Sequence, residues 1–272
     1  MNKMTKFACS FINIIIKSMI QAMIFAAGLG TRLKPITDHM PKAMVSVGGE
    51  PLIKHVIDRL KAAGAERIIV NVHHFASQIT GYLKKNNNFD IDIRISDETE
   101  KLLDTGGGIK KAAHLFDDAS PILIHNVDIL SNVDLKRFYE AEPMVIAEGD
   151  EKVGLTDALL LVSERKTKRY LLFNEGMRLV GWTNVETGEV RSPYPGLNPE
   201  ECRMYAFAGI HVLSPRLFRM MDEEFPDKFG IIDFYLKACA THSIKGYVKE
   251  DLKLLDVGKL DSLKEAEEFL RG

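Results

Sequence analysis

Apolar residues recur along the first half of the chain in two spacings, one typical of strands and one typical of helices. A continuous apolar run of strand length occupies 22–27, the largely apolar stretches 68–72 and 121–125 predict two further buried strands, and the stretch 91–95 alternates apolar and polar residues. Amphipathic stretches between them predict helices over 51–63, 75–84 and 108–115. This alternation predicts an α/β fold, a Rossmann-like three-layer sandwich with a mostly parallel central sheet.

The second half of the chain is less regular. Strand patterns stand at 158–163, 169–173, 178–182, 206–213 and 244–255, and helical patterns at 215–224, 231–241 and 260–270. We expect an elaborated, partly antiparallel second half, with a surface loop over 186–201. Because strand patterns lie on both sides of the midpoint, one domain over 19–272 is favoured over two.

The first eighteen residues contain an apolar run, 7–16, that follows two lysines and resembles a short signal peptide. Lys17 interrupts this run well short of the ~20 residues that span a bilayer. Met19 is a natural start just before the first strand. We therefore expect 1–18 to be an extension from an upstream start; a peripheral helix or a targeting segment is the alternative.

Composition excludes several classes of function. A net charge of −2 argues against non-specific binding to nucleic acid or to membranes, which needs a basic face. The three cysteines are scattered, so they form neither a disulfide framework nor a zinc-binding spacing. We predict a cytoplasmic protein whose anionic ligands are held by a few well-placed cations.

The first candidate site is the glycine loop, Ala26-Ala27-Gly28-Leu29-Gly30-Thr31-Arg32, which follows the first strand. Small residues and glycines let backbone N–H groups approach an anion closely. Arg32 adds a planar fork suited to phosphate oxygens, and Lys42, after Pro41, adds a point charge. The loop lacks the third glycine of a dinucleotide fingerprint and the Gly-Lys-Ser/Thr of a Walker A loop. A plain turn with two surface cations is the alternative.

The second candidate site is a pair of acids far apart in the sequence. Asp128 follows the strand pattern at 121–125, and Asp256 follows a short apolar stretch near the C-terminus. Residues just beyond the carboxyl ends of parallel strands share one crevice. Two carboxylates that meet there can hold Mg²⁺, although an aspartate after a strand is more often a helix cap or a turn residue.

These motifs resemble the signature of the sugar-1-phosphate nucleotidylyltransferases. The resemblance extends through Asp104-Thr105-Gly106-Gly107-Gly108, Asn126-Val127-Asp128, Phe207-Ala208-Gly209-Ile210 and Asp256-Val257-Gly258, in the order of that family. The Thr-Gly-Gly-Gly segment is similar in particular to the N-acetylmuramic acid 1-phosphate uridylyltransferases of cell-wall recycling. The mannose-1-phosphate guanylyltransferases are close relatives.

The resemblance implies roles for individual residues. Arg32 and Lys42 are expected to be catalytic, and Asp128 and Asp256 to bind Mg²⁺. Sugar-phosphate contacts are expected from Asn126, Asn184 and Gly209. Nucleotide contacts are expected from Ala26, Ala27, Gly28, Leu29, Gly30, Thr31, Arg32, Thr105, Gly106 and Gly107. The nucleotide-binding half then covers about 19–130 and the sugar-binding half about 131–272.

The chain departs from the family pattern in two places. Val127 stands where the family usually has glycine, and a β-branched residue does not easily adopt a positive φ. The Glu-Lys-Pro sugar motif is absent, and Gly181-Trp182-Thr183-Asn184 occupies about that place. These departures leave the acceptor less well defined than the triphosphate.

The resemblance implies condensation of a nucleoside triphosphate, UTP favoured, with a sugar 1-phosphate to give a nucleotide sugar and pyrophosphate. Another base or acceptor, such as GTP with mannose 1-phosphate, is the alternative within this class. A catalytically inactive nucleotide-sugar sensor is an alternative of another class, suggested by Val127. A dehydrogenase is the remaining alternative, disfavoured by the missing third glycine.

Overall fold

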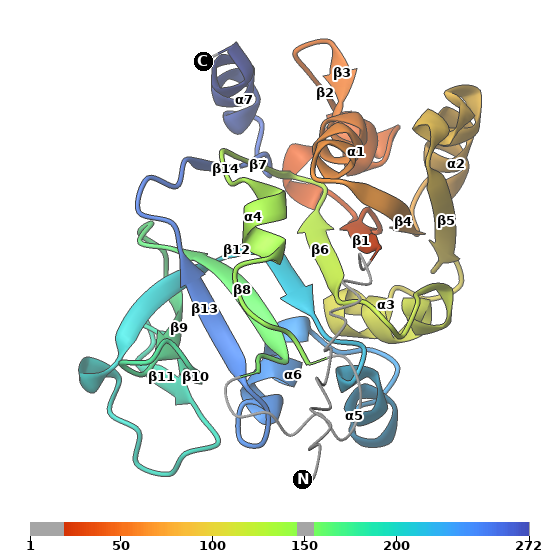
Figure 1. The fold of residues 1–272 in the computed structure, drawn as a ribbon. Coiled ribbons are helices and arrows are strands. Elements are labelled where there is room, and N and C mark those ends of the chain that lie inside the picture. The colour runs from red at the N-terminus through yellow and green to blue at the C-terminus, as the bar shows by residue number, and fades with distance from the viewer. Residues whose placement is uncertain (1–18, 146–154, 272) are drawn as a thin grey trace, which may run out of the picture.

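The computed structural model describes residues 19–145 and 155–271, so the expected N-terminal extension lies outside the described residues. Its centre is a ten-stranded mixed sheet (Figure 1). Four parallel strands occur in the order β5 (Asp92–Asp97), β4 (Ala65–Val72), β1 (Ile20–Phe25) and β6 (Ile122–Asn126). The strands β1, β4 and β6 are largely buried on both faces, which explains why most of their residues are apolar. The expected α/β fold with a parallel core is confirmed.

Antiparallel strands from the second half extend the same sheet. β12 (Arg203–Leu213) pairs with β6, and β8 (Ala158–Ser163) joins β12 to β13 (Ile244–Val248). The other end of β12 pairs with β9 (Arg169–Phe173), which continues into β10 (Leu179–Asn184) and β11 (Glu189–Arg191). The expected loop over 186–201 thus contains an edge strand, which is too short and too exposed to show in the apolar pattern.

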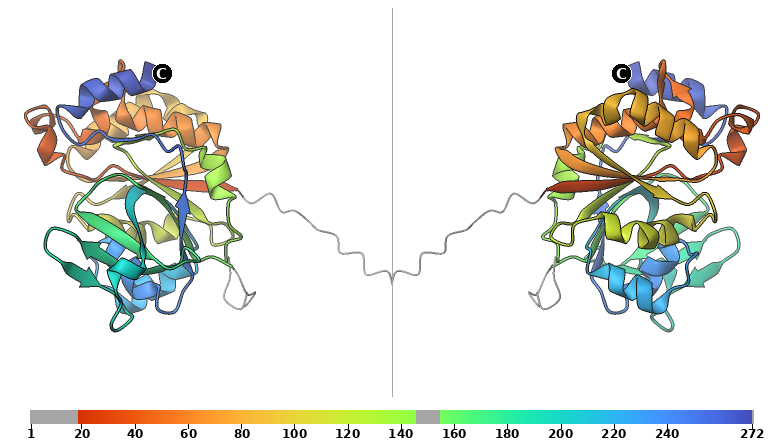
Figure 2. Two further views of the ribbon diagram at one scale, coloured as in Figure 1. Left: turned by 90° about the vertical axis from the view of Figure 1, so that its left-hand side faces the viewer. Right: turned by 90° about the vertical axis from the view of Figure 1, so that its right-hand side faces the viewer.

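Helices cover both faces of the sheet (Figure 2). One face carries α1 (Leu52–Ala62), α2 (Ala76–Lys85) and α7 (Ser262–Arg271), and the other carries α3 (Asp104–Ala112), α5 (Leu217–Glu224) and α6 (Ile231–Ala238). Each face has its own buried apolar cluster, and α4 (Leu135–Tyr139) joins the cluster of the first face. Among the described residues, no helix is long and apolar enough to cross a membrane.

Short elements complete the chain and bring the two halves together. β7 (Ile129–Ser131) pairs with β14 (Leu254–Asp256), and β2 (Ser46–Val47) pairs with β3 (Glu50–Pro51). The 3-10 turns are η1 (Thr31–Leu33), η2 (Ile36–Asp38), η3 (Lys42–Met44), η4 (Asn87–Asp90), η5 (Ala113–Leu115) and η6 (Pro199–Glu201). The expected helix at 108–115 begins earlier, at Asp104, so the glycine run lies inside its first turns.

Candidate active site

The glycine loop lies where β1 ends and lines a cavity of about 480 Å³, here called the loop cavity. Gly30 has a φ of 63°, and a Cβ added there would lie 2.8 Å from the Thr37 methyl group, so this position requires glycine. Gly28 has nothing within 4 Å of the place of its missing Cβ. Gly30 therefore shapes the loop, whereas Gly28 leaves open space in which a ligand can approach the backbone.

Two buried polar side chains hold the start of the loop. The Asn71 side-chain oxygen accepts hydrogen bonds from the N–H groups of Ala26 at 2.7 Å and Ala27 at 3.3 Å. Asn71 in turn donates to Glu98 at 2.7 Å, and the second Glu98 oxygen accepts from Leu103 N–H at 3.1 Å. Burial raises the pKa of the Glu98 carboxyl. Neither residue was among the predicted site residues, although Asn71 interrupts a buried strand, where a polar side chain must find a partner.

The pairing of β7 with β14 brings the two predicted metal ligands together. Asp256 lies opposite Ile129 in this pairing, and Val257 N–H donates to the Asp128 carbonyl oxygen at 2.8 Å. Burial, and next the negative charge of Asp128, raise the pKa of the Asp256 carboxyl. One Asp256 oxygen is buried without a hydrogen-bond partner in the described structure.

These carboxylates fit a hard divalent cation. One buried Asp256 oxygen beside a second carboxylate has no hydrogen-bond partner, and Mg²⁺ is typically held by one or two carboxylates together with waters and phosphates. The described residues contain no group of three His, Cys, Asp or Glu side chains arranged to hold a metal, so the metal hypothesis rests on these two aspartates.

The predicted cations lie beside the carboxylates. The Lys42 ammonium forms an ion pair with Asp128 and is almost completely buried. An Arg32 nitrogen lies 4.0 Å from the other Asp256 oxygen, and its side chain is largely exposed. Both cations line the loop cavity, so their charges are available to a bound polyphosphate.

The glycine run in the first turns of α3 has different surroundings from those expected. A Cβ on Gly106 would lie 2.3 Å from the Phe229 ring, and one on Gly107 would lie 2.0 Å from the Asp227 carbonyl oxygen. Both amides donate to the Phe229 carbonyl oxygen, at 2.9 and 3.2 Å. The amides of Gly106 and Gly107 are therefore used by the protein itself rather than left free for a base, and the glycines make room for the segment before α6.

Asp104, Thr105 and Lys228, from the same two segments, do line the loop cavity. Thr105 lines it, and its hydroxyl accepts a hydrogen bond from Ile231 N–H at 2.9 Å. Lys228 also lines the cavity, and it belongs to the segment before α6 that packs against Gly106 and Gly107. Lys228 could not be predicted as a site residue, because an exposed lysine in a loop resembles any solvated surface charge.

The predicted acceptor residues are separated in the structure. Asn126 lines the loop cavity, and Gly209, with a φ of 75°, lies against it: a Cβ on Gly209 would come within 2.7 Å of the Asn126 amide nitrogen. Asn184 is at the end of β10, where its side chain accepts from Glu186 N–H at 3.1 Å. Asn184 lines neither the loop cavity nor the cavity beside β9 and β10 described below.

Val127 adopts a backbone conformation that any residue can take. It is not among the described residues with positive φ, and its side chain is buried in the apolar cluster beside α1. Its N–H donates to the Phe25 carbonyl oxygen at 3.2 Å, which joins the ends of β6 and β1. The departure from glycine therefore imposes no strain on the site.

The fold and this site define the class of protein. Residues 21–170 match the model of the family described as nucleotidyl transferase, and this stretch is more than half of the chain. The chain belongs to the nucleotidyl transferase family, which confirms the resemblance found in the sequence.

Individual relatives agree with this assignment. The N-acetylmuramate alpha-1-phosphate uridylyltransferase of Caulobacter vibrioides is 32% identical over 238 residues, 85% of this chain and 89% of the relative. Mannose-1-phosphate guanylyltransferase 1 of Arabidopsis thaliana is 30% identical over 62% of this chain, which spans about half of that relative's length (48%). In fold, the chain resembles HddC from Yersinia pseudotuberculosis complexed with GMP-PN, with a TM-score of 0.68, 24% identity and coverage of 93% of this chain and 100% of HddC.

Proposed function

We propose that this protein transfers a uridylyl group from UTP to a sugar 1-phosphate in a Mg²⁺-dependent reaction that releases pyrophosphate. The observation that carries the proposal is the meeting of Asp128 and Asp256 beside the glycine loop, with Lys42 and Arg32 next to them. UTP is favoured because a relative that matches over 89% of its own length is named as a uridylyltransferase.

The proposed reaction is a single displacement at the α-phosphorus. An oxygen of the sugar 1-phosphate forms a bond to this phosphorus, and the bond to the β-phosphate oxygen breaks, so that pyrophosphate leaves with the electron pair. The acceptor phosphate is already ionised at neutral pH, and no general base is required. This agrees with the loop cavity, which no described histidine lines.

The residues of the site act by positioning and charge neutralisation. Arg32 is exposed and directed to the site, so it is assigned to the β- and γ-phosphates. Lys42 is held by Asp128 and is assigned to the α-phosphate, where negative charge increases in the transition state. Asp128 and Asp256 would hold Mg²⁺, which when bound neutralises phosphate charge. Asn71, held by Glu98, accepts from the N–H groups of Ala26 and Ala27 and so fixes the start of the loop.

The test is a pyrophosphate-release screen of the four ribonucleoside triphosphates and dTTP against a panel of sugar 1-phosphates, with Mg²⁺ and with chelator. We expect the highest kcat/KM with UTP and loss of turnover in chelator. A preference for GTP with mannose 1-phosphate would support the guanylyltransferase alternative. Nucleotide binding without pyrophosphate release from any pair would refute the enzyme assignment and favour the sensor.

A further inference from the structure

The strand that carries Asp256 is short and weakly paired. β14 has three residues, and among the described residues it pairs with β7 alone, as β7 pairs with β14 alone. Side chains of a strand alternate between its two faces, so a shift of one residue in this pairing would turn Asp256 to the opposite face. A pairing of three residues has few backbone hydrogen bonds to resist such a shift. The place of Asp256 therefore depends on other contacts that fix the register.

The surroundings of Asp256 suit one register only. Burial, and next the negative charge of Asp128, raise the pKa of the Asp256 carboxyl. Three positive charges lower this pKa, those of Lys42, Arg32 and Arg165. The next residue, Val257, is fully buried in the apolar cluster beside α1. A shift of one residue would bring an apolar neighbour, Leu255 or Val257, to these charges in place of the carboxylate.

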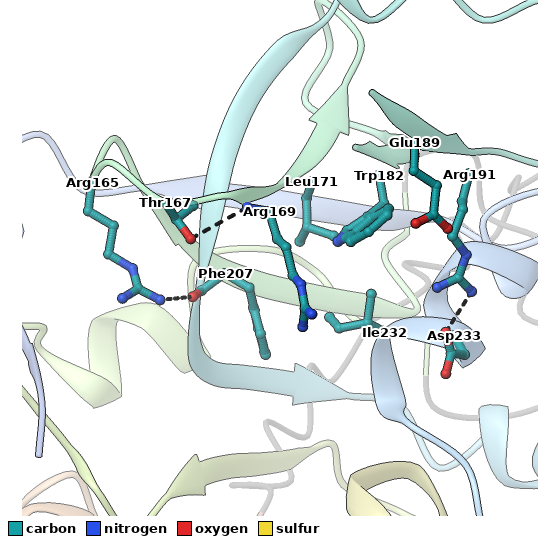
Figure 3. A pocket seen from close by; sticks show the side chains of 10 residues that line it. All are labelled: Arg165, Thr167, Arg169, Leu171, Trp182, Glu189, Arg191, Phe207, Ile232 and Asp233. Carbon is teal, nitrogen blue, oxygen red and sulfur yellow. Dashed lines mark hydrogen bonds and ion pairs between the residues drawn. The ribbon is translucent and has the colours of Figure 1, made fainter. Parts of the chain in front are cut away.

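One of these charges, Arg165, belongs to a second cavity, of about 580 Å³, beside β9, β10 and β11 (Figure 3). This cavity shares no lining residue with the loop cavity. Arg165 donates to the carbonyl oxygen of Phe207, a residue of β12, at 3.2 Å (Figure 3). The large sheet therefore holds Arg165 independently of β14, and β14 has to bring Asp256 to a charge whose place is already fixed.

The side chain of Asn132 adds hydrogen bonds that only one register allows. Asn132 is exposed and directly follows β7. Its amide nitrogen donates to the Asp251 carbonyl oxygen at 2.9 Å, and its amide oxygen accepts from Lys253 N–H at 2.9 Å. Its backbone N–H donates to the Lys253 carbonyl oxygen at 3.1 Å. One residue thus holds the backbone just before β14 at two points, and a shift of one residue would break all three hydrogen bonds.

The segment that carries Asn132 is itself fixed to α1. The terminal nitrogens of Arg59 donate to the Ser131 hydroxyl at 3.0 Å and to the Val133 carbonyl oxygen at 2.6 Å. Ser131 and Val133 flank Asn132, and both are buried. Asn132 therefore projects from a segment that is held from behind, so its amide provides a fixed reference for the backbone of the paired strand.

We propose that Asn132 is a positioning residue for the proposed reaction: its side chain sets the register of β14 against β7 and so places Asp256 beside Asp128. Asn132 lines neither cavity and stands four positions after Asp128, and its partner Lys253 stands three positions before Asp256. It therefore acts through the backbone rather than on a ligand. The inference rests on the proposed function, because it concerns the two carboxylates assigned to Mg²⁺ there.

The test measures metal binding and the strand pairing without turnover. Mn²⁺ is titrated into the protein together with a UTP analogue that has a methylene bridge between the α- and β-phosphorus, and free Mn²⁺ is followed by electron paramagnetic resonance. Asn132→Ala is expected to weaken Mn²⁺ binding about 10- to 100-fold. Hydrogen exchange of the Val257 amide should become about 5- to 100-fold faster, because two hydrogen bonds next to the pairing are lost. Asn132→Asp keeps the acceptor for Lys253 N–H and should give intermediate values.

Asn198→Ala is the matched control, because it removes another exposed asparagine whose amide is hydrogen-bonded at both ends. Asn198 accepts from Glu200 N–H at 3.1 Å, donates to Glu201 at 3.0 Å and lines neither cavity, so both measurements should stay unchanged. Unchanged Mn²⁺ binding in Asn132→Ala, or equal effects in both variants, would overturn the role of Asn132. Absence of pyrophosphate release from the unaltered protein would instead refute the proposed function, since neither measurement requires turnover.

Discussion

Asp128 and Asp256 are held side by side by a two-stranded pairing in which Val257 N–H donates to the Asp128 carbonyl oxygen. Backbone hydrogen bonds between two paired strands, rather than the conformation of a loop, therefore fix the separation of the two carboxylates. The burial that raises the pKa of Asp256 also means that its ionised form destabilises the fold until a cation binds.

Replacing either aspartate with asparagine is expected to lower kcat at least about 100-fold, because the paired charge is lost from the reacting phosphates. For Asp256→Asn, the free energy of unfolding at neutral pH without Mg²⁺ should stay equal or rise. Because the pKa of Asp256 is higher in the folded protein than in the unfolded chain, ionisation of this carboxyl lowers the free energy of unfolding as the pH rises to neutrality. An asparagine amide cannot ionise, so this loss is absent from the variant. Steady-state kinetics and urea titrations measure the two effects. The exposed Asp58, paired with Lys54 at 2.8 Å, provides the control substitution Asp58→Asn, which should leave turnover unchanged.

Gly107→Ala is expected to destabilise the protein by about 1–3 kcal/mol or more, because its Cβ would lie 2.0 Å from the Asp227 carbonyl oxygen. Gly81→Ala is the matched control: Gly81 lies inside α2 with nothing within 4 Å, and alanine there should stabilise by about 0.5–1 kcal/mol. Urea unfolding of both variants gives the comparison. A neutral Gly107→Ala would show that the segment before α6 is not seated on the glycine run.

Lys228→Gln is expected to raise the KM for the nucleoside triphosphate by about 1.4- to fivefold, with little change in kcat. This is the effect of losing an exposed charge interaction of about 0.2–1 kcal/mol. Lys101→Gln serves as the control, since Lys101 is also exposed, contacts Asp227 at 3.3 Å and does not line the loop cavity. An unchanged KM in Lys228→Gln would remove this residue from the nucleotide site.

Stability is expected to fall as the pH is lowered from about 6.5 toward 3. Burial lowers the pKa of His125 and of His211 to about 3, so the unfolded chain binds more protons than the folded protein over this interval. Each histidine contributes a slope of up to about 1.4 kcal/mol per pH unit. Urea titrations from pH 7 to pH 4.5 should show a shallower slope in His211→Gln. The exposed His114, replaced in the same way, provides the comparison.

The parallel half of the fold was predictable because three of its strands are largely buried and mostly apolar, and the fourth, β5, alternates apolar and polar residues. The edge strand Glu189–Arg191 was not predictable, because it has only three residues, all exposed, and so shows no apolar pattern. The helix at Asp104–Ala112 was placed too late because glycine normally disfavours helices. Only the contacts with Phe229 and Asp227, distant in the sequence, explain why glycines are needed there.

The candidate site likewise contains some residues that were predictable from the sequence and others that were not. Arg32, Lys42, Asp128 and Asp256 were singled out because they occur in short motifs, and the structure brings all four together. Asn71, Glu98 and Lys228 depend on contacts between segments far apart in the chain, which a single sequence does not display. Asn184 was placed by analogy with an absent motif, and the structure puts it outside both cavities.

The late position of β14 has a consequence for the synthesis of the protein. The glycine loop, Asp128 and all strands of the large sheet precede Asp256 in the chain. A nascent chain can therefore form the nucleotide-binding core on the ribosome while the second carboxylate has not yet been translated. We expect such chains to be catalytically silent, so that activity begins only when Asp256 emerges and β14 pairs with β7.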